Sequence, residues 1–158
     1  MNLARLDITD TDRLSAVASS PILQLQQIIN GKGSYYSSFF RKKKDGTKRE
    51  INPPKPELAA IQRRLNDHLQ KRLVWTAAVH GGISKRGIIT NAEGHLNKQW
   101  IANLDISNFF PSTETSQVES ALQRAGCSAP AANLFAELTT GEFKVLMQRR
   151  KRRPRLAS

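Results

Sequence analysis

Hydrophobic positions recur at helical spacing over much of the chain. The clearest stretch follows Pro56, where apolar residues return every three or four positions. Its members are Leu58, Ile61, Leu65, Leu69 and Leu73. Pro56 suits the first turn of a helix, since that turn does not use its backbone nitrogen as a donor. Arg63 and Arg64 lie off the stripe, so the pattern predicts a helix with one packed face and one basic, solvated face.

Shorter helices are predicted on both sides of this one. A cap signal at Asp10 predicts a helix from there, and Ser20-Pro21 predicts another that ends at Gly31. Later helices are expected over residues 88–96, after Pro111 through Val118 and Leu122 to a stop at Gly126, and from Ser128 onward. Helices should therefore dominate the fold.

Two segments have the pattern of β structure. Residues 35–44 are aromatic and then basic, and Asp45-Gly46-Thr47 separates them from residues 48–51, which predicts a β-hairpin with a cationic tip. Trp100–Ile106 alternates apolar and polar positions, which predicts a buried strand with one polar face.

Charge and composition narrow the class of partner. The chain has 158 residues, the size of one domain, and its 25 Lys+Arg against 13 Asp+Glu give a net charge of +12. Residues 141–158 contribute +6 (seven basic residues and Glu142), which leaves 12 − 6 = +6 for residues 1–140. Such a surplus favours a polyanion such as nucleic acid. Cys127 is the sole cysteine, and no stretch is apolar enough for a membrane span, so we expect a soluble, cytoplasmic protein.

The segment 103–112, NLDISNFFPS, is the most informative for chemistry. It places Asp105 among apolar residues near the end of the predicted strand, where an ionised carboxylate needs a partner. Mg²⁺ would be a suitable partner, because it prefers carboxylate and carbonyl oxygens. The alternative interpretation is that Asp105 caps the following turn.

This segment resembles the first palm motif of retron and group II intron reverse transcriptases. FRKKKDGTKREI (residues 40–51) is similar to their fingertip hairpin, and INPPKPELAAIQRRL (51–65) to their next block. HGGISKRGIITNAEGH (80–95) resembles the segment before their first catalytic strand. Four blocks in family order are more specific than any single motif.

The resemblance implies roles for particular residues. Asp105 would bind two catalytic Mg²⁺ ions and the backbone carbonyl of Ile106 would bind one of them, in a two-metal polymerase mechanism. Phe110 would stack under the incoming sugar and exclude a 2′-hydroxyl; otherwise Phe109 and Phe110 are core residues, as we expect one of them to be. Lys43 and Arg49 would hold the triphosphate; the alternative is a solvated hairpin. Arg63 and Arg64 would contact nucleic acid.

The implied fold is α+β, the fingers and partial palm of a right-hand polymerase, helix-rich with a β-hairpin. Residues 1–34 would form an amino-terminal helical segment, 35–140 the reverse transcriptase fingers and partial palm, and 141–158 a basic tail that we expect to be disordered. The implied function is RNA-directed DNA synthesis, with an RNA template or primer and deoxynucleoside triphosphates as partners. Retron, intron and phage-defence systems all stay open.

The resemblance stops before the later palm motifs. The sequence lacks the PQG block and the Tyr-x-Asp-Asp hairpin that carries two further carboxylates. A single Asp scarcely holds two divalent ions, so we expect this chain alone to be inactive, with the missing palm either absent or encoded downstream. The alternative function is a non-catalytic RNA-binding remnant or module. Residues 149–155 either belong to a purposeful basic arm or follow from a change of reading frame.

Overall fold

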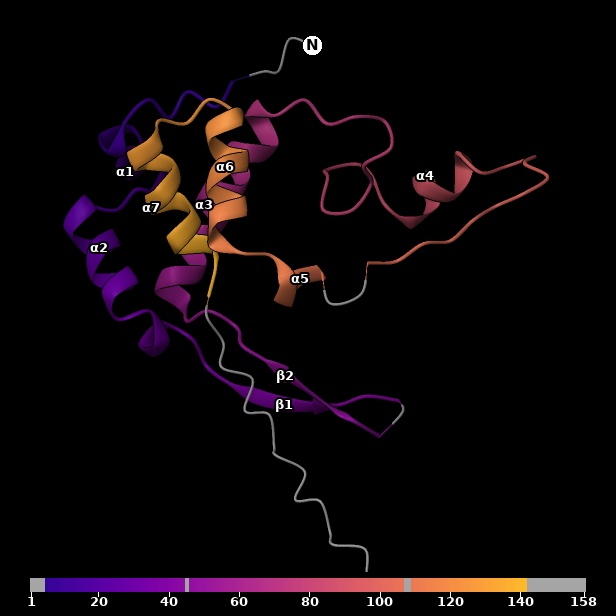
Figure 1. The fold of residues 1–158 in the computed structure, drawn as a ribbon, viewed down its shortest axis with the longest axis horizontal. Coiled ribbons are helices and arrows are strands. Elements are labelled where there is room, and N and C mark those ends of the chain that lie inside the picture. The colour runs from indigo at the N-terminus through magenta and orange to yellow at the C-terminus, as the bar shows by residue number, and fades with distance from the viewer. Residues whose placement is uncertain (1–4, 45, 107–108, 142–158) are drawn as a thin grey trace, which may run out of the picture.

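Figure 1 shows most of the helices gathered into one body, from which a β-hairpin and a long arm that carries a further helix extend in different directions. The computed structural model describes residues 5–44, 46–106 and 109–141, and for Pro111 the backbone alone. The basic tail expected at 141–158 lies, apart from Gly141, outside the described residues. Within the described part of the chain, no helix is both long and apolar enough to cross a membrane.

The first two helices start and end close to where the sequence predicts. Helix α1 (Thr11–Ala18) is capped by Asp10, whose carboxylate accepts a hydrogen bond of 2.7 Å from the Arg13 backbone nitrogen. Helix α2 (Ile22–Asn30) ends at Gly31 and buries Leu25 and Ile28. A short 3₁₀ helix, η1 (Lys32–Tyr35), leads from α2 toward the hairpin. The predictions for this region are confirmed.

The long amphipathic helix is α3 (Pro56–Arg72), and its predicted apolar stripe faces the core. Leu58, Ile61 and Leu65 are fully buried, whereas Leu69 and Leu73 pack at its margin. Helix α6 (Thr115–Arg124) and helix α7 (Ala129–Thr139) follow later in the chain, as predicted after Pro111 and from Ser128.

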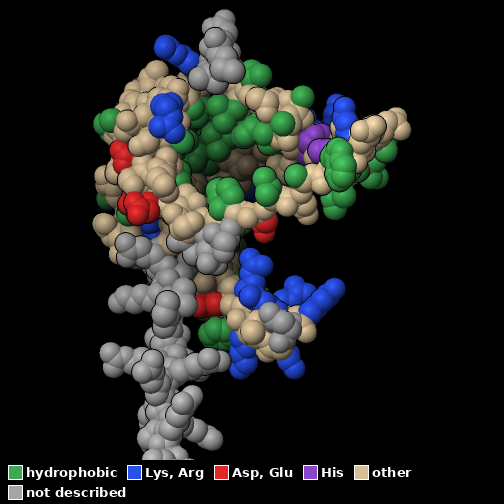
Figure 2. Space-filling view, turned by 45° about the vertical axis from the view of Figure 1, so that its right-hand side comes forward, with side chains coloured by type: hydrophobic (Ala, Val, Ile, Leu, Met, Phe, Trp, Pro, Cys, Tyr) green, Lys and Arg blue, Asp and Glu red, His purple; other side chains and the backbone are tan. Residues whose placement is uncertain are grey.

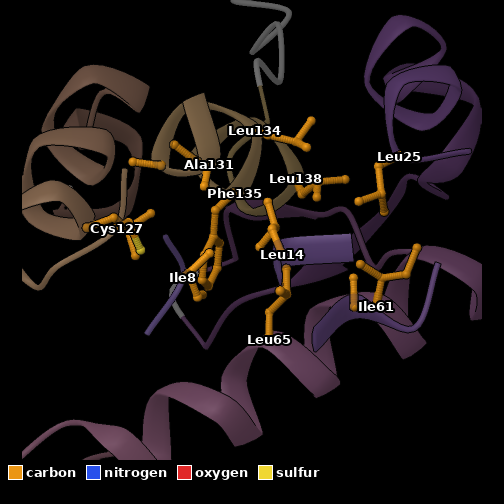
Figure 3. Packing of buried hydrophobic residues seen from close by; sticks show 14 of the residues in the cluster. Ile8, Leu14, Leu25, Ile61, Leu65, Cys127, Ala131, Leu134, Phe135 and Leu138 are labelled. Atoms are coloured by element: carbon orange, nitrogen blue, oxygen red, sulfur yellow. The ribbon is translucent and has the colours of Figure 1, made fainter. Parts of the chain in front are cut away.

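One hydrophobic core joins elements from both ends of the described chain. Helix α7 supplies more of its residues than any other element and packs against α1, α2, α3 and α6 (Figure 3). The extended segment before α1 adds Leu6 and Ile8, and it is tied to the α6–α7 turn by backbone hydrogen bonds: Leu6 N donates to Ala125 O at 2.8 Å and Ser128 N to Ile8 O at 3.0 Å. The amino-terminal residues and the last two helices therefore depend on each other for burial.

The hairpin consists of β1 (Phe39–Lys42) and β2 (Lys48–Ile51), paired antiparallel. The predicted hairpin is confirmed; β2 coincides with the predicted residues 48–51, whereas β1 is shorter than the predicted segment 35–44. Its base is anchored to the helical body, since Lys55 N donates to Tyr35 O at 2.7 Å and Gln62 on α3 donates to the Tyr36 hydroxyl and the Leu138 carbonyl.

The arm consists of residues 74–106 and includes helix α4 (Ile88–Glu93), which lies within the predicted helix over 88–96. The loop before α4, residues 75–86, is closed by Arg86, whose guanidinium donates to the carbonyls of Trp75, Thr76 and Val79. His80 Nδ1 lies 2.9 Å from the Thr90 hydroxyl and links this loop to α4.

The prediction of a strand over Trp100–Ile106 is wrong. These residues form no regular element, and Trp100 and Leu104 are each 91% exposed. A strand needs a neighbour to complete its backbone hydrogen bonds. The sheet of the described chain consists of β1 and β2, and residues 100–106 pair with neither of them.

The aromatic pair after the arm also differs from its prediction. Phe109 and Phe110 begin a short helix, α5 (Phe109–Ser112), and pack edge to face with ring centroids 5.3 Å apart. Neither ring belongs to the core, since Phe109 is 52% exposed and Phe110 81%. The expectation that one of the two is buried is wrong here.

Candidate nucleotide and nucleic-acid interface

The hairpin places its basic side chains on two faces. Arg41 pairs with Arg49 across the strands, and Lys42 pairs with Lys48. Directly opposed residues share a face, and successive residues along a strand alternate between faces. The pairing continues toward the tip, where the Lys43 backbone nitrogen donates to the Thr47 carbonyl at 2.7 Å.

We call the two sides the arginine face and the lysine face. The arginine face is formed by Phe39, Arg41, Arg49 and Ile51, and the same alternation, continued past the last pair to the Lys43–Thr47 hydrogen bond, adds Lys43. The lysine face is formed by Phe40, Lys42, Lys48 and Glu50. Figure 2 shows Lys and Arg side chains projecting from opposite sides of the hairpin. Lys43 and Arg49, which the sequence predicts to hold a triphosphate, thus lie on the same face, together with Arg41.

This arrangement of charge is unfavourable without a counter-ion. Like charges directly opposite one another destabilise a β-ladder, and the hairpin has two such pairs in succession. Its cations are exposed, and among the described residues none of them forms an ion pair. A bound polyanion would remove the repulsion, so the geometry suits phosphate groups.

Asp105 is exposed, contrary to the expectation of a carboxylate embedded in a strand. Ile106, whose carbonyl is the second predicted metal ligand, is 68% exposed. Among the described residues no three His, Cys, Asp or Glu side chains come together in a way that could hold a metal ion. The described donors therefore do not fit a complete two-metal site, although Asp105 is accessible as a single ligand.

Arg63 and Arg64 have different surroundings on α3, although both are exposed. The Arg64 guanidinium donates to the Ala18 carbonyl at 3.0 Å and so caps the end of α1. No such contact is found for Arg63 within the described chain. Arg63 is therefore the freer of the two predicted nucleic-acid contacts.

The predicted residues fall into separate groups. Lys43 and Arg49 share the hairpin, whereas Asp105 and Phe110 lie at the junction of the arm and α5. In the view of Figure 1, α5 lies beside the lower part of the helical body, and the hairpin lies below both. Figure 2 also shows a hollow lined by hydrophobic side chains between the body and the arm.

Sequence reasoning singled out two hairpin cations and missed Arg41, Lys42 and Lys48 as members of the two faces. The signal that identifies them is the strand register. With Gly46 at the turn, the alternation of faces along residues 39–42 and 48–51 follows once the pairing partner of each residue is known.

Comparison with known proteins identifies relatives of one kind. The chain is 36% identical over 107 residues to the retron Mx162 reverse transcriptase of Myxococcus xanthus, which is 68% of this chain and 22% of that protein. It is 30% identical over 140 residues to the retron Se72 reverse transcriptase of Salmonella heidelberg, with 87% of this chain and 37% of that protein covered. A third relative, the retron Mx65 reverse transcriptase of Myxococcus xanthus, is 33% identical over 106 residues, or 67% and 25%. No family model matches the sequence.

The matches include the candidate metal ligand. A stretch of at least 67% of 158 residues contains residues 54–105 wherever it begins, so all three matches extend across α3 and the arm to Asp105. The chain spans between 22% and 37% of the length of these relatives. With three curated relatives of the same kind covering 67% to 87% of its residues, the chain belongs to the retron-type reverse transcriptases.

Proposed function

We propose that this chain is the fingers and first palm segment of an RNA-directed DNA polymerase, over residues 35–140. The observation that carries the proposal is the match to three retron reverse transcriptases across a stretch that includes Asp105. The exposed hairpin, with opposed cation pairs that favour phosphate, supports the same function.

In this proposal each predicted residue has a distinct task. Lys43 and Arg49 hold the triphosphate of a deoxynucleotide, for which a flexible ammonium and a forked guanidinium are both suited. Phe110 contacts the sugar, and its exposure leaves the ring available. Arg63 contacts the phosphates of an RNA template or primer. Arg64 contacts the same phosphates when its guanidinium leaves the Ala18 carbonyl.

Asp105 supplies one carboxylate ligand for Mg²⁺, and the Ile106 carbonyl supplies a neighbouring oxygen. Bound Mg²⁺ would neutralise phosphate charge and activate the primer hydroxyl. The remaining ligands have to come from the nucleotide phosphates and from residues other than those described, since the described ones bring no further carboxylates to Asp105. We therefore expect the 158-residue chain alone to give no primer extension above background.

The second candidate function is RNA binding without catalysis. It is favoured by the incomplete set of metal ligands among the described residues, and it needs the hairpin and α3 alone. RNA affinity that stays unchanged when Lys43, Arg49 and Arg63 are neutralised would count against it.

A chimaera tests the polymerase proposal directly. The stretch of the retron Se72 reverse transcriptase that matches this chain would be replaced by the matching residues, which include 22–137 wherever the match begins. We expect the chimaera to extend a DNA primer on an RNA template, and Asp105→Ala to lower the rate by about 100-fold or more, because a metal ligand is lost. Asp67→Ala, which removes an exposed carboxylate from α3, is the matched control and should leave the rate unchanged. An active chimaera in which Asp105→Ala and Asp67→Ala behave alike would refute the assignment of Asp105.

A further inference from the structure

The lysine face of the hairpin has no task in the proposed function. Its two cations, Lys42 and Lys48, oppose each other on the side of the ladder away from Arg41 and Arg49. Both residues are exposed, and neither forms an ion pair within the described chain. The repulsion between them calls for an anion of its own, because a ligand on the arginine face lies on the other side of the two strands.

A hairpin of two strands can bind a different ligand on each side. Nothing in the described chain covers either face, since residues 39–42 and 48–49 are all exposed. A triphosphate bound by Lys43 and Arg49 would therefore leave the lysine face open to solvent. The ligand of the lysine face must also account for the aromatic residue that lies beside the two lysines.

That residue is Phe40, which is 63% exposed. Burial of an aromatic ring is normally favourable, so a large exposed ring beside cations is typical of a surface on which bases stack. A base can stack on a side chain only when its own face is free, which holds in a single strand and not inside a duplex. The face thus combines lysines for phosphates with an aromatic ring for a base.

Glu50 gives this face a direction. It lies directly opposite Phe40, whereas the two lysines are two positions nearer the tip. Its carboxylate repels phosphate, so the phosphates of a bound strand belong near Lys42 and Lys48 and the base belongs near Phe40. We propose that the lysine face binds single-stranded nucleic acid while the arginine face takes the nucleotide triphosphate. The assignment of the triphosphate to the arginine face rests on the proposed function.

Two double variants of equal charge test the assignment of faces. Lys42→Ala with Lys48→Ala is compared with Arg41→Ala with Arg49→Ala in the full chain, by fluorescence anisotropy of a labelled single-stranded oligouridylate over a range of salt concentrations. We expect the lysine pair to lower the slope of log affinity against log salt by about 1.4, since each single-strand phosphate contact contributes about 0.7. The arginine pair should change that slope by less than half as much. Equal changes in both double variants would overturn the proposal.

The role of the ring is tested in the same assay. Phe40→Leu keeps an apolar side chain but loses the stacking surface, and we expect it to weaken single-strand binding by about fivefold or more. Phe39→Leu on the other face is the matched control and should have less than a twofold effect. A blunt-ended RNA duplex should bind the wild type and the two phenylalanine variants with similar affinity. Equal effects of the two phenylalanine variants on the single strand would count against the assignment.

Two controls separate this proposal from others. Lys42→Arg with Lys48→Arg keeps the charge, so retained affinity in that variant shows that the alanine pair acts through charge and not through loss of the hairpin. The chimaera with Asp105→Ala reads out catalysis and leaves the lysine face intact. Loss of primer extension with full single-strand binding therefore supports both proposals, whereas an inactive chimaera with normal face selectivity would refute the polymerase proposal alone.

Discussion

At the scale of single residues, Asp7 joins three elements of the body. Its carboxylate lies 2.9 Å from the Arg13 guanidinium on α1, 3.1 Å from Arg72 and 3.1 Å from His68 Nε2, the last two on α3. The hydrogen bond from Arg13 is the main cause that holds the pKa of Asp7 below its usual value, with smaller contributions from Arg72. The charged form of Asp7 therefore stabilises the packing of the amino-terminal segment.

This network predicts a pH dependence. Because the pKa is lowered in the folded state, the contribution of Asp7 is fully present above the ordinary carboxyl value of 3.8 and is lost as the pH falls through the folded-state pKa. Melting temperatures of the wild type and of Asp7→Asn should thus differ most near neutral pH and converge in acid, when measured from about pH 6 to about pH 3. Asp67→Asn, on the same α3 but outside the network, should follow the wild type. A difference that grows in acid would contradict this account.

Arg63 and Arg64 should separate stability from binding. Arg64→Ala removes the hydrogen bond to the Ala18 carbonyl and should lower the free energy of unfolding by about 1 kcal/mol, since the group is partly solvated. Arg63→Ala should change it by less than about 0.5 kcal/mol. Urea denaturation measures both. Equal free energies of unfolding for the two variants would show that the hydrogen bond from Arg64 to the end of α1 does not stabilise the fold.

At the scale of elements, the hairpin depends on one backbone conformation at its tip. Gly46 has φ of +82°, in the left-handed region, and its backbone nitrogen donates to the Lys43 carbonyl at 3.1 Å. An added Cβ would meet no other atom within 4 Å, so any effect of substitution comes from the backbone conformation and not from a clash.

Substitution of Gly46 should therefore act through strain. We expect Gly46→Ala to destabilise the hairpin by about 1 kcal/mol, whereas Gly46→Asn should cost less because asparagine tolerates this conformation. Cross-strand contacts between β1 and β2, followed by nuclear magnetic resonance, measure hairpin formation, and the melting of the helical body is the internal control. Cross-strand contacts of equal strength in Gly46→Ala and Gly46→Asn would show that the hairpin does not need the left-handed conformation at position 46.

At the scale of the whole molecule, the helical body and the arm differ in burial. Leu65 on α3 has no exposed surface, whereas Leu104 in the arm is 91% exposed. Leu65→Ala should lower the free energy of unfolding by about 2–5 kcal/mol, because it leaves a cavity in the core. Leu104→Ala should change it by less than about 0.5 kcal/mol. Comparable losses in the two variants would mean that the arm packs on the body in solution.

The sequence by itself determined the local elements and the family. The leucine stripe of α3, the Asp10 cap and the turn at Gly46 are short-range signals, because helix periodicity, caps and turns depend on residues a few positions apart. The four ordered motifs likewise indicated a reverse transcriptase of the retron or group II intron type, and the relatives confirm the retron type.

Only the tertiary structure decided which segments are buried and which cations share a face. The alternation at Trp100–Ile106 suits a strand, yet a strand forms against a neighbour, and the described chain provides none there. The division of the basic residues between an arginine face and a lysine face depends on the pairing of β1 with β2. Burial and strand register both depend on contacts between distant residues, so no local pattern specifies them.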